Sequence, residues 1–298
     1  MNRTNCQLEK IGEEISKQYD FKSIKQLPLS FQEIVTSGYY GDIYIGSSDK
    51  YDSKNASKKV VIKLMHDTKY NRQDINRLRK VQYILNARIC PHFPILYGVF
   101  RINNVKFKGI FGNGVTKLHN ISERIQRGPA IGYLMENLGN MTLENYIYKK
   151  PNKTELKQIL FQCFVGIYSL IKYAHMNHGD FHFKNIMMLK LKKPIEYVYY
   201  IDNVKYKVKA KSYSPVIIDI NGNEPNTKIR QMKDISVICN QIKTFVPEIW
   251  NDMDISLESS TIKKFFERNF HEYKHSYNFN SEISNNVRLN NKYEFTFL

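Results

Sequence analysis

The chain contains the segment His178-Gly179-Asp180-Phe181-His182-Phe183-Lys184-Asn185, directly followed by the apolar run Ile186-Met187-Met188-Leu189. A polar segment with glycine before a short apolar run predicts a loop that enters a β-strand. The loop carries a carboxylate at Asp180 and an amide at Asn185, five positions apart. A carboxylate can accept the proton of a hydroxyl group, and an amide oxygen can hold a magnesium ion. A surface loop with a chance combination of these residues is the alternative.

A turn with two glycines lies far upstream, in residues 36–44. Gly38 and Gly41 stand between the strand-like residues 31–35 and the alternating Ile43 and Ile45. Glycines in such a turn let backbone N–H groups approach phosphates. Taken alone, however, this segment fits an ordinary hairpin turn better.

Two further strand-like segments each carry one charged side chain. Residues 58–65 alternate in polarity and place Lys63 on the face opposite Ile62 and Leu64. Residues 214–219 read as an apolar strand that ends in Asp219. A solvated lysine and an acid at a strand end are commonplace when each is taken singly. The four segments in this order and at these separations are together a much stronger signal.

This set of motifs resembles the eukaryotic-type protein kinase superfamily over roughly residues 31–245. The resemblance implies an α+β, two-lobed fold with a small antiparallel-sheet N-lobe and a mainly helical C-lobe. We therefore expect an N-terminal helical extension in residues 1–27, the N-lobe in 28–138 and the C-lobe in 139–298. An extended hairpin at about 190–214 would belong to the C-lobe.

The resemblance also implies ATP and Mg²⁺ as cofactors and gives each motif residue a role. Asp180 corresponds to the catalytic base, Lys63 to the lysine that pairs with the nucleotide phosphates, and Asn185 and Asp219 to the magnesium ligands. Residues 131–139 look like the fifth strand and hinge, with Met135 as gatekeeper. The expected nucleotide-binding residues are Thr36, Gly38, Gly41, Ile43, Lys63, Met135, Glu136 and Leu138. Thr36 departs from the pattern because it stands where the first glycine of the loop would be.

The catalytic loop departs from most protein kinases at two positions. Gly179 replaces an arginine, and His182 replaces the lysine that follows the catalytic aspartate in protein-serine kinases. The pattern H-G-D-x-H-x-x-N is similar to aminoglycoside and choline kinases, and D-x-H also occurs in haspin-type protein kinases. Lys184 is our candidate for the missing cation.

The region after the loop also differs from a conventional kinase. Asp219 is only 15 positions before Asp234, and no A-P-E motif follows. Ile220-Asn221 replaces the Phe-Gly of D-F-G, and asparagine tolerates a positive φ better than most residues do. Asp234 is our candidate for the helix-F aspartate that braces the catalytic loop. Regulation by phosphorylation of an activation loop is not expected.

Residues 197–208 read as two alternating runs around the turn pair Asp202-Asn203, which predicts an extended β-hairpin. Haspin-type kinases and kinases of large nucleocytoplasmic DNA viruses, including the poxvirus virion kinases, look similar in this region. The hairpin either binds substrate or packs on the C-lobe, and we favour packing.

Helix C is expected within about residues 74–87, yet no glutamate lies between Met65 and Ser122. The partner of Lys63 must therefore be Asp74, another polar group such as Gln82, or absent. A pseudokinase would fit the last option. The retained Lys63, together with the aspartates and the asparagine of the other motifs, argues against it.

Three helical features are predicted from local patterns. Thr142 is a candidate helix cap, and residues 155–175 read as a long, mostly buried helix. Leu8, Ile11 and Ile15 lie on one face of an N-terminal helix. The tail from residue 278 onward is rich in Asn and Ser and is expected to be loosely packed until residues 293–298.

Composition sets the outer limits of the interpretation. A chain of 298 residues with 42% hydrophobic content suits a two-lobed domain without accessory domains. The net charge is +17, from 45 basic and 28 acidic residues, so the surface should attract polyanions such as nucleic acid or an anionic surface. Lysine and asparagine enrichment from an AT-rich coding sequence explains that charge equally well.

The cysteine spacing and the hydropathy of the chain predict where in the cell the protein is found. Cys6, Cys90, Cys163 and Cys239 have no paired spacing, which predicts a reducing environment and no zinc site. No signal peptide or transmembrane segment is recognised, which predicts a soluble intracellular monomer, in the host cytoplasm or virion if the protein is viral.

The sequence thus predicts an ATP- and Mg²⁺-dependent serine/threonine protein kinase resembling those of large DNA viruses, acting on an unidentified protein substrate. Two alternatives stay open. One is a small-molecule phosphotransferase of the aminoglycoside or choline kinase type. The other is a nonenzymatic scaffold that uses a kinase fold to bind a polyanion.

Overall fold

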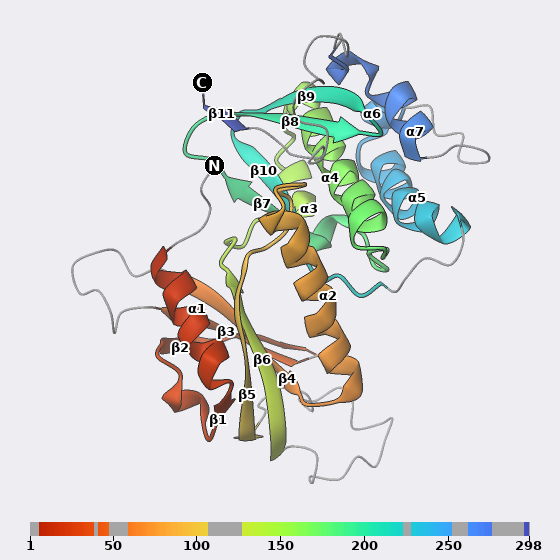
Figure 1. The fold of residues 1–298 in the computed structure, drawn as a ribbon. Helices are drawn as coiled ribbons and strands as arrows, with labels where there is room; N and C mark the ends of the chain where they lie inside the picture. Colours follow the sequence, from red (N-terminus) through yellow and green to blue (C-terminus); the bar gives the residue numbers. More distant parts are fainter. Residues whose placement is uncertain are drawn as a thin grey trace, which may run out of the picture. The chain divides into compact units, whose positions relative to one another are not determined.

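The computed structural model describes residues 6–38, 41–47, 59–106, 127–222, 228–251, 262–275 and 295–297 (Figure 1). The chain forms two compact units. The sheet unit consists of Asn2–Arg79 and Ile95–Asn137, and the helical unit consists of Met1, Lys80–Pro94 and Leu138–Leu298. Both contain strands and helices, so the predicted α+β class is confirmed.

The sheet unit is built on a six-stranded sheet with the strand order β1-β5-β6-β4-β3-β2. Its strands are β1 (Asp20–Phe21), β2 (Ser30–Gly38), β3 (Gly41–Ser47), β4 (Lys59–His66), β5 (Leu96–Lys106) and β6 (Arg127–Glu136). All neighbouring pairs are antiparallel except β1 and β5, which are parallel. The prediction of a purely antiparallel sheet is therefore wrong at this edge, where the segment after the first helix adds a short strand.

Helix α1 (Cys6–Gln18) packs on this sheet through the apolar face that the sequence predicted. Leu8, Ile11 and Ile15 are buried in a core shared with β4, β5 and β6. Gly12 permits the close approach, because a Cβ there would lie 2.1 Å from the Tyr97 carbonyl oxygen. A 3₁₀ turn (η1, Ile24–Gln26) follows. Helix α2 (Lys69–Asn86) confirms the helix expected near residues 74–87.

The helical unit contains two small sheets and most of the helices. Its helices are α3 (Leu143–Ile147), α4 (Lys153–Tyr173), α5 (Lys228–Phe245), α6 (Pro247–Trp250) and α7 (Ile262–Asn269), with 3₁₀ turns η3 (Phe183–Asn185) and η4 (His271–Tyr273). One antiparallel pair joins β7 (Ile186–Lys190) to β10 (Tyr213–Ile217). The other sheet has the order β11-β8-β9, from β8 (Ile195–Ile201), β9 (Val204–Ala210) and β11 (Phe295–Phe297).

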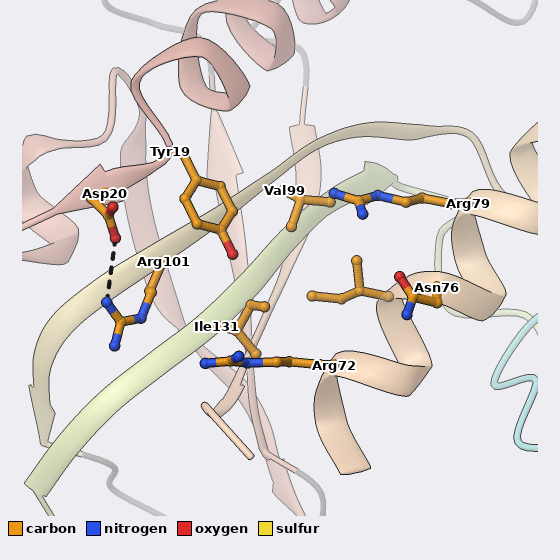
Figure 2. A pocket seen from close by; sticks show the side chains of 9 residues that line it. Tyr19, Asp20, Arg72, Asn76, Arg79, Val99, Arg101 and Ile131 are labelled. Atoms are coloured by element: carbon orange, nitrogen blue, oxygen red, sulfur yellow. Dashed lines mark ion pairs between the residues drawn. The ribbon is translucent and has the colours of Figure 1, made fainter. Parts of the chain in front are cut away.

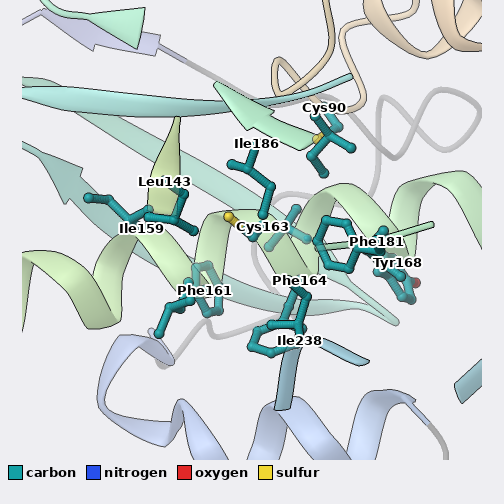
Figure 3. Close-up of a cluster of buried hydrophobic side chains, with 14 of the residues drawn as sticks. Cys90, Leu143, Ile159, Phe161, Cys163, Phe164, Tyr168, Phe181, Ile186 and Ile238 are labelled. Atoms are coloured by element: carbon teal, nitrogen blue, oxygen red, sulfur yellow. The ribbon is translucent and has the colours of Figure 1, made fainter. Parts of the chain in front are cut away.

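Helix α4 is the centre of the helical unit's core, as predicted. Residues 159–170 are buried along its whole circumference, and Figure 3 shows Phe161 and Phe164 projecting from it towards Ile238. Asn152 caps its start by accepting from the backbone N–H groups of Thr154 and Glu155. The cap predicted at Thr142 is also confirmed, since its hydroxyl accepts from Asn145 N at 3.2 Å. Within the described residues, no helix has the length and apolar character needed to cross a membrane.

The predicted hairpin is present as β8 and β9, and it packs on the helical unit. Asp202 and Asn203 both have positive φ, +45° and +68°, as a tight two-residue hairpin turn requires. Tyr197, Tyr199 and Tyr206 are buried in the same core as α4. The favoured interpretation of the hairpin as a packing element is therefore confirmed.

Phe161 is a test of how much stability this core provides. Its ring contacts the rings of Tyr199 from β8, Tyr206 from β9 and Phe270, the residue that follows α7. We expect Phe161→Ala to lower the free energy of unfolding by about 3–5 kcal/mol, measured by urea denaturation. Tyr148→Ala, at a side chain that is 65% exposed, should change it by less than about 1 kcal/mol. Equal losses in the two variants would contradict this account of the core.

Candidate active site

The loop between α4 and β7 carries the polar residues that the sequence singled out. Phe181 and Phe183 are buried, whereas Asp180 before them and Lys184 after them are exposed. This alternation anchors the backbone through two phenyl rings and turns the polar groups outward. The 3₁₀ turn η3 then leads directly into β7, so the predicted loop entering a strand is confirmed.

Asp180, His182 and Asn185 form one cluster within this loop. The Asn185 amide nitrogen donates to the Asp180 carbonyl oxygen at 3.0 Å and to its carboxylate at 3.3 Å. His182 Nε2 lies 3.4 Å from the same carboxylate and 3.2 Å from the Asn185 amide nitrogen. The two acceptors on Asp180 fix the orientation of the Asn185 amide, because only its nitrogen can donate to them. Its Oδ1 is thereby turned to the other side of the amide group.

Asp219 follows β10 and is tied to this loop through both of its flanks. Ile218 N donates to the Asn185 carbonyl oxygen at 2.9 Å, and Asn221 N donates to the His178 carbonyl oxygen at 2.9 Å. The backbone of Asp219 is left-handed, with φ +60°. Asn221 is of a residue type that tolerates positive φ, but the left-handed position of this segment is Asp219.

Asp234, on α5, braces the start of the loop as predicted. Its carboxylate is buried and accepts from the backbone N–H groups of His178, at 2.6 Å, and Gly179, at 3.0 Å. Burial raises the pKa of Asp234, and the two N–H donors oppose this by stabilising the charged form. His178 and Asp234 are 56 positions apart, so no local sequence pattern connects their two segments.

His178 is a second connection, and the sequence reasoning did not assign it. Its Nε2 lies 2.9 Å from the Ile218 carbonyl oxygen, which can only accept, so this nitrogen carries the proton. Nδ1 is then an acceptor for Asp180 N at 3.3 Å. Burial lowers the pKa of His178 to about 4, which keeps the ring neutral near pH 7. The histidine directly before Gly-Asp was the available signal.

Gly179 and Gly222 form a close backbone contact at this loop. Gly179 has φ +87°, and a Cβ there would lie 2.9 Å from both the N and the Cα of Gly222. A Cβ on Gly222 would lie 1.9 Å from the Asn177 carbonyl oxygen. The two backbones therefore pack directly against each other. A side chain at position 179 requires a shift of one of the two backbones.

The other predicted site residues lie in the sheet unit, with the exception of Leu138. Lys63 is opposite Ile43 and Tyr133 in the β-ladder, and Ile62 and Leu64 on either side of it are buried, as predicted. On α2, Asp74 accepts from Arg77, and Gln82 donates to Asn86 at 2.9 Å. A contact of Lys63 with Asp74 or Gln82 stays a prediction.

The expected nucleotide-binding segments are a hairpin and a strand end. Gly38 pairs with Gly41 at the end of the β2–β3 hairpin, while residues 39 and 40 and the side chain of Thr36 lie outside the described part. Gly41 has φ +141°, and a Cβ there would lie 2.2 Å from the Leu64 carbonyl oxygen. Met135 and Glu136 end β6, and Leu138 belongs to the helical unit. The structure thus brings together Asp180, Asn185 and Asp219; their meeting with the sheet-unit residues stays a prediction.

The polar residues of the helical unit fit one kind of metal ion better than others. Among the described residues, no group of three or more His, Cys, Asp and Glu side chains is arranged to hold a metal. The remaining donor pair, an amide oxygen at Asn185 and a carboxylate at Asp219, consists of hard oxygen ligands. Mg²⁺ is usually bound by one or two carboxylates together with substrate phosphates. The donor set therefore fits Mg²⁺ that arrives with a phosphate ligand.

No protein-family model matches the chain, and no curated protein matches it.

The contact between Gly179 and Gly222 predicts a specific stability difference. Gly179 and Gly139 have similar φ values, +87° and +80°, but a Cβ on Gly139 would meet nothing within 4 Å. We expect Gly139→Ala to cost about 1 kcal/mol through backbone strain alone, and Gly179→Ala to cost about 1–2 kcal/mol more through the clash. Urea denaturation of both variants measures the difference. Similar costs at both positions would show that the backbones can separate freely.

The buried neutral His178 predicts a pH-dependent stability. The unfolded chain takes up a proton at His178 below about pH 6.5, but the folded protein does so only near pH 4. The contribution of His178 is therefore fully present above pH 6.5 and is lost as the pH falls towards 4, by about 2 kcal/mol at pH 5. His178→Gln lacks this titration. The stability difference between wild type and variant should thus shrink by that amount between pH 7.5 and pH 5, and a constant difference would contradict the prediction.

Proposed function

We propose that this protein is an ATP- and Mg²⁺-dependent phosphotransferase of the protein kinase type that phosphorylates serine or threonine hydroxyl groups of a protein substrate. One observation carries the proposal. Asp180, Asn185 and Asp219 lie in segments that one hydrogen-bond network joins, with His178 at its centre. The buried carboxylate of Asp234 anchors this network by accepting from His178 N. Such a set of a base and two oxygen ligands, fixed by backbone hydrogen bonds, is what phosphoryl transfer requires.

Asp180 is suited to be the base. Its side chain is 55% exposed, so an acceptor hydroxyl can reach it, and Asn185 holds one of its oxygens. In the proposed reaction, Asp180 orients the acceptor hydroxyl and takes its proton while the phosphoryl group is transferred. Lys63 would pair with the nucleotide phosphates from β4, and the β2–β3 hairpin with Gly38 and Gly41 would cover them.

Asn185 and Asp219 would hold Mg²⁺. The bound ion would neutralise charge on the phosphate oxygens during transfer. The protein's own part is to orient these two ligands: the Asn185 amide is fixed by Asp180, and the backbone around Asp219 is fixed by Asn185 and His178. The left-handed backbone at Asp219 sets the direction in which its carboxylate leaves the chain.

We further propose a two-lobed kinase fold, in which the sheet unit is the N-lobe and the helical unit is the C-lobe. A mainly antiparallel sheet with one long helix, and a second unit centred on α4 and α5, support this assignment. The 15 positions between Asp219 and Asp234 and the packed β8–β9 hairpin support a relationship to haspin-type kinases and kinases of large DNA viruses. A place in the host cytoplasm or the virion belongs to the same proposal.

One observation favours a second candidate, a small-molecule phosphotransferase of the aminoglycoside or choline kinase type. His182 contacts both Asp180 and Asn185, at a position where protein-serine kinases carry a lysine. Replacement of a lysine by a histidine there would suit an acceptor that brings its own positive charge. We place this candidate second because of the packed hairpin.

Transfer of radiolabelled phosphate from ATP tests the proposal. The purified protein is incubated with Mg²⁺ and, separately, with a basic protein, an acidic protein and a panel of amino-alcohols and aminoglycosides. We expect label on protein, lowered about 10²–10⁴-fold in Asp180→Asn because the base is lost. Glu248→Gln, at an exposed acid on α6, should keep full activity.

Three outcomes decide between the candidates. Label on a small molecule alone would replace the first candidate by the second. Magnesium-dependent transfer that survives in Asp180→Asn would remove the role given to Asp180. No transfer to any acceptor, together with no Mg²⁺-dependent ATP binding, would favour a nonenzymatic scaffold that binds a polyanion.

A further inference from the structure

A pocket of about 460 Å³ lies within the sheet unit, between α2 and the strands β5 and β6 (Figure 2). It is separate from the residues assigned to phosphoryl transfer. Three arginines line it, Arg72 and Arg79 from α2 and Arg101 from β5. Among the described residues its lining holds one acid, Asp20, whose carboxylate lies 3.6 Å from Arg101. The pocket is therefore a concave site with an excess of guanidinium groups.

Two of these arginines are held in place by one buried acid, Asp67. Its side chain is 1% exposed and receives two hydrogen bonds from Arg72, at 2.5 and 2.9 Å, and one from Arg101 at 2.7 Å. These hydrogen bonds lower the pKa of Asp67, although burial opposes them, so the carboxylate stays charged. Arg101 Nη1 also pairs with Asp20 and donates to Asn103 Oδ1 at 3.4 Å. An arginine has five N–H donors, so both side chains keep N–H groups for a ligand. The two guanidinium groups are thus oriented before any ligand binds.

The third arginine supplies the uncompensated charge. Arg79 is exposed and makes no hydrogen bond or ion pair with any residue in the described part of the chain. Arg72, Asn76 and Arg79 follow each other at i, i+4 and i+7, so they project from one face of α2. Figure 2 shows the guanidinium groups of Arg72 and Arg79 reaching from the helix towards the strands, with Asn76 between their attachment points.

Tyr19 lines the side of the pocket opposite α2, and its backbone is in a strained, left-handed conformation. It follows the last residue of α1 with a left-handed φ of +54°, a position where glycine is the usual residue. Its N–H donates to the Ile15 carbonyl oxygen at 2.8 Å, and its own carbonyl oxygen accepts from Arg101 N at 2.7 Å. In Figure 2 its hydroxyl group is directed into the space between Val99 and Ile131. A strained tyrosine that points its hydroxyl into a ring of arginines suggests a hydrogen bond to a ligand.

We propose that this pocket binds a phosphoryl group, carried either by a free phosphate compound or by a phosphorylated residue of a peptide. Guanidinium forks match the oxygens of phosphate, and a dianion gains more than a single carboxylate from several oriented cations. The bound group would accept from Arg79, from the spare N–H groups of Arg72 and Arg101, and from the Tyr19 hydroxyl. The inference is independent of the proposed kinase activity, because none of these residues has a role in it.

Equilibrium dialysis with radiolabelled inorganic phosphate tests whether the pocket binds a phosphoryl group. Fluorescence anisotropy with a labelled phosphoserine peptide, beside the same peptide without the phosphate, tests whether a phosphorylated protein carries that group. We expect saturable binding of phosphate, of the phosphopeptide or of both. Arg79→Gln should weaken it about tenfold, the value of one charge-assisted hydrogen bond. The matched control is Arg88→Gln, which removes the same charge from an exposed arginine just after α2, outside the pocket, and should change the affinity less than twofold. Tyr19→Phe should weaken it a fewfold.

The outcomes distinguish a phosphorylated protein from a free phosphate compound, and three results would overturn the proposal. A phosphopeptide that binds at least tenfold more tightly than phosphate identifies a phosphorylated protein as the ligand, and similar affinities identify a free phosphate compound. Equal weakening by Arg79→Gln and Arg88→Gln would reduce the effect to net charge and overturn the proposal. So would tight binding of the unphosphorylated peptide, or the absence of saturable binding by either probe. Because Arg79 has no partner within the described part of the chain, its variant is expected to fold, which a thermal melt of each protein verifies.

Discussion

The buried carboxylate of Asp234 fixes the start of the polar loop, and the geometry of that loop follows from it. Removing a carboxylate from water is costly unless hydrogen bonds replace the lost hydration. Here the backbone N–H groups of His178 and Gly179 supply them, and these N–H groups would otherwise have no partner at the start of an irregular segment. Helix α5 and the loop therefore satisfy each other. His178 extends the constraint through its ring to Ile218, so that the segment carrying Asp219 is held by the same anchor.

A second constraint is the direct contact between two backbone segments at a pair of glycines. The backbones at Gly179 and Gly222 are so close that a methyl group on either would collide with the other strand of the chain or with Asn177. A side chain at position 179 would require one of these backbones to shift. The contact also leaves little freedom to the two residues between Asp219 and Gly222, which is consistent with the left-handed backbone at Asp219.

Both units use one buried aspartate as an organising centre, with opposite electrostatic results. Asp234 is surrounded by neutral backbone donors, so burial dominates and its pKa is raised. Asp67 is surrounded by two guanidinium groups, so charged hydrogen bonds dominate and its pKa is lowered. The first arrangement positions a backbone, whereas the second positions cations. A chain with a net charge of +17 can thus carry positive charge in an ordered local site as well as spread over its surface.

The sequence by itself determined the elements that depend on neighbours along the chain. The periodicity of residues 155–175 identified α4, the pair Asp202-Asn203 identified the hairpin turn, and the alternation around Lys63 gave its strand face. Such features follow from turn chemistry and from the repeat of apolar residues, which are local properties. The order of the motifs also singled out Asp234, although only the fold shows which N–H groups it accepts from.

Tertiary structure alone decided the features that join distant segments. Three such features are the contact of Gly179 with Gly222, the positive φ at Asp219, and the two arginines on Asp67. Each arises where segments that are separate in the sequence meet. A sequence pattern does not encode them, because each depends on the distance between two backbones that reach the same place by separate routes.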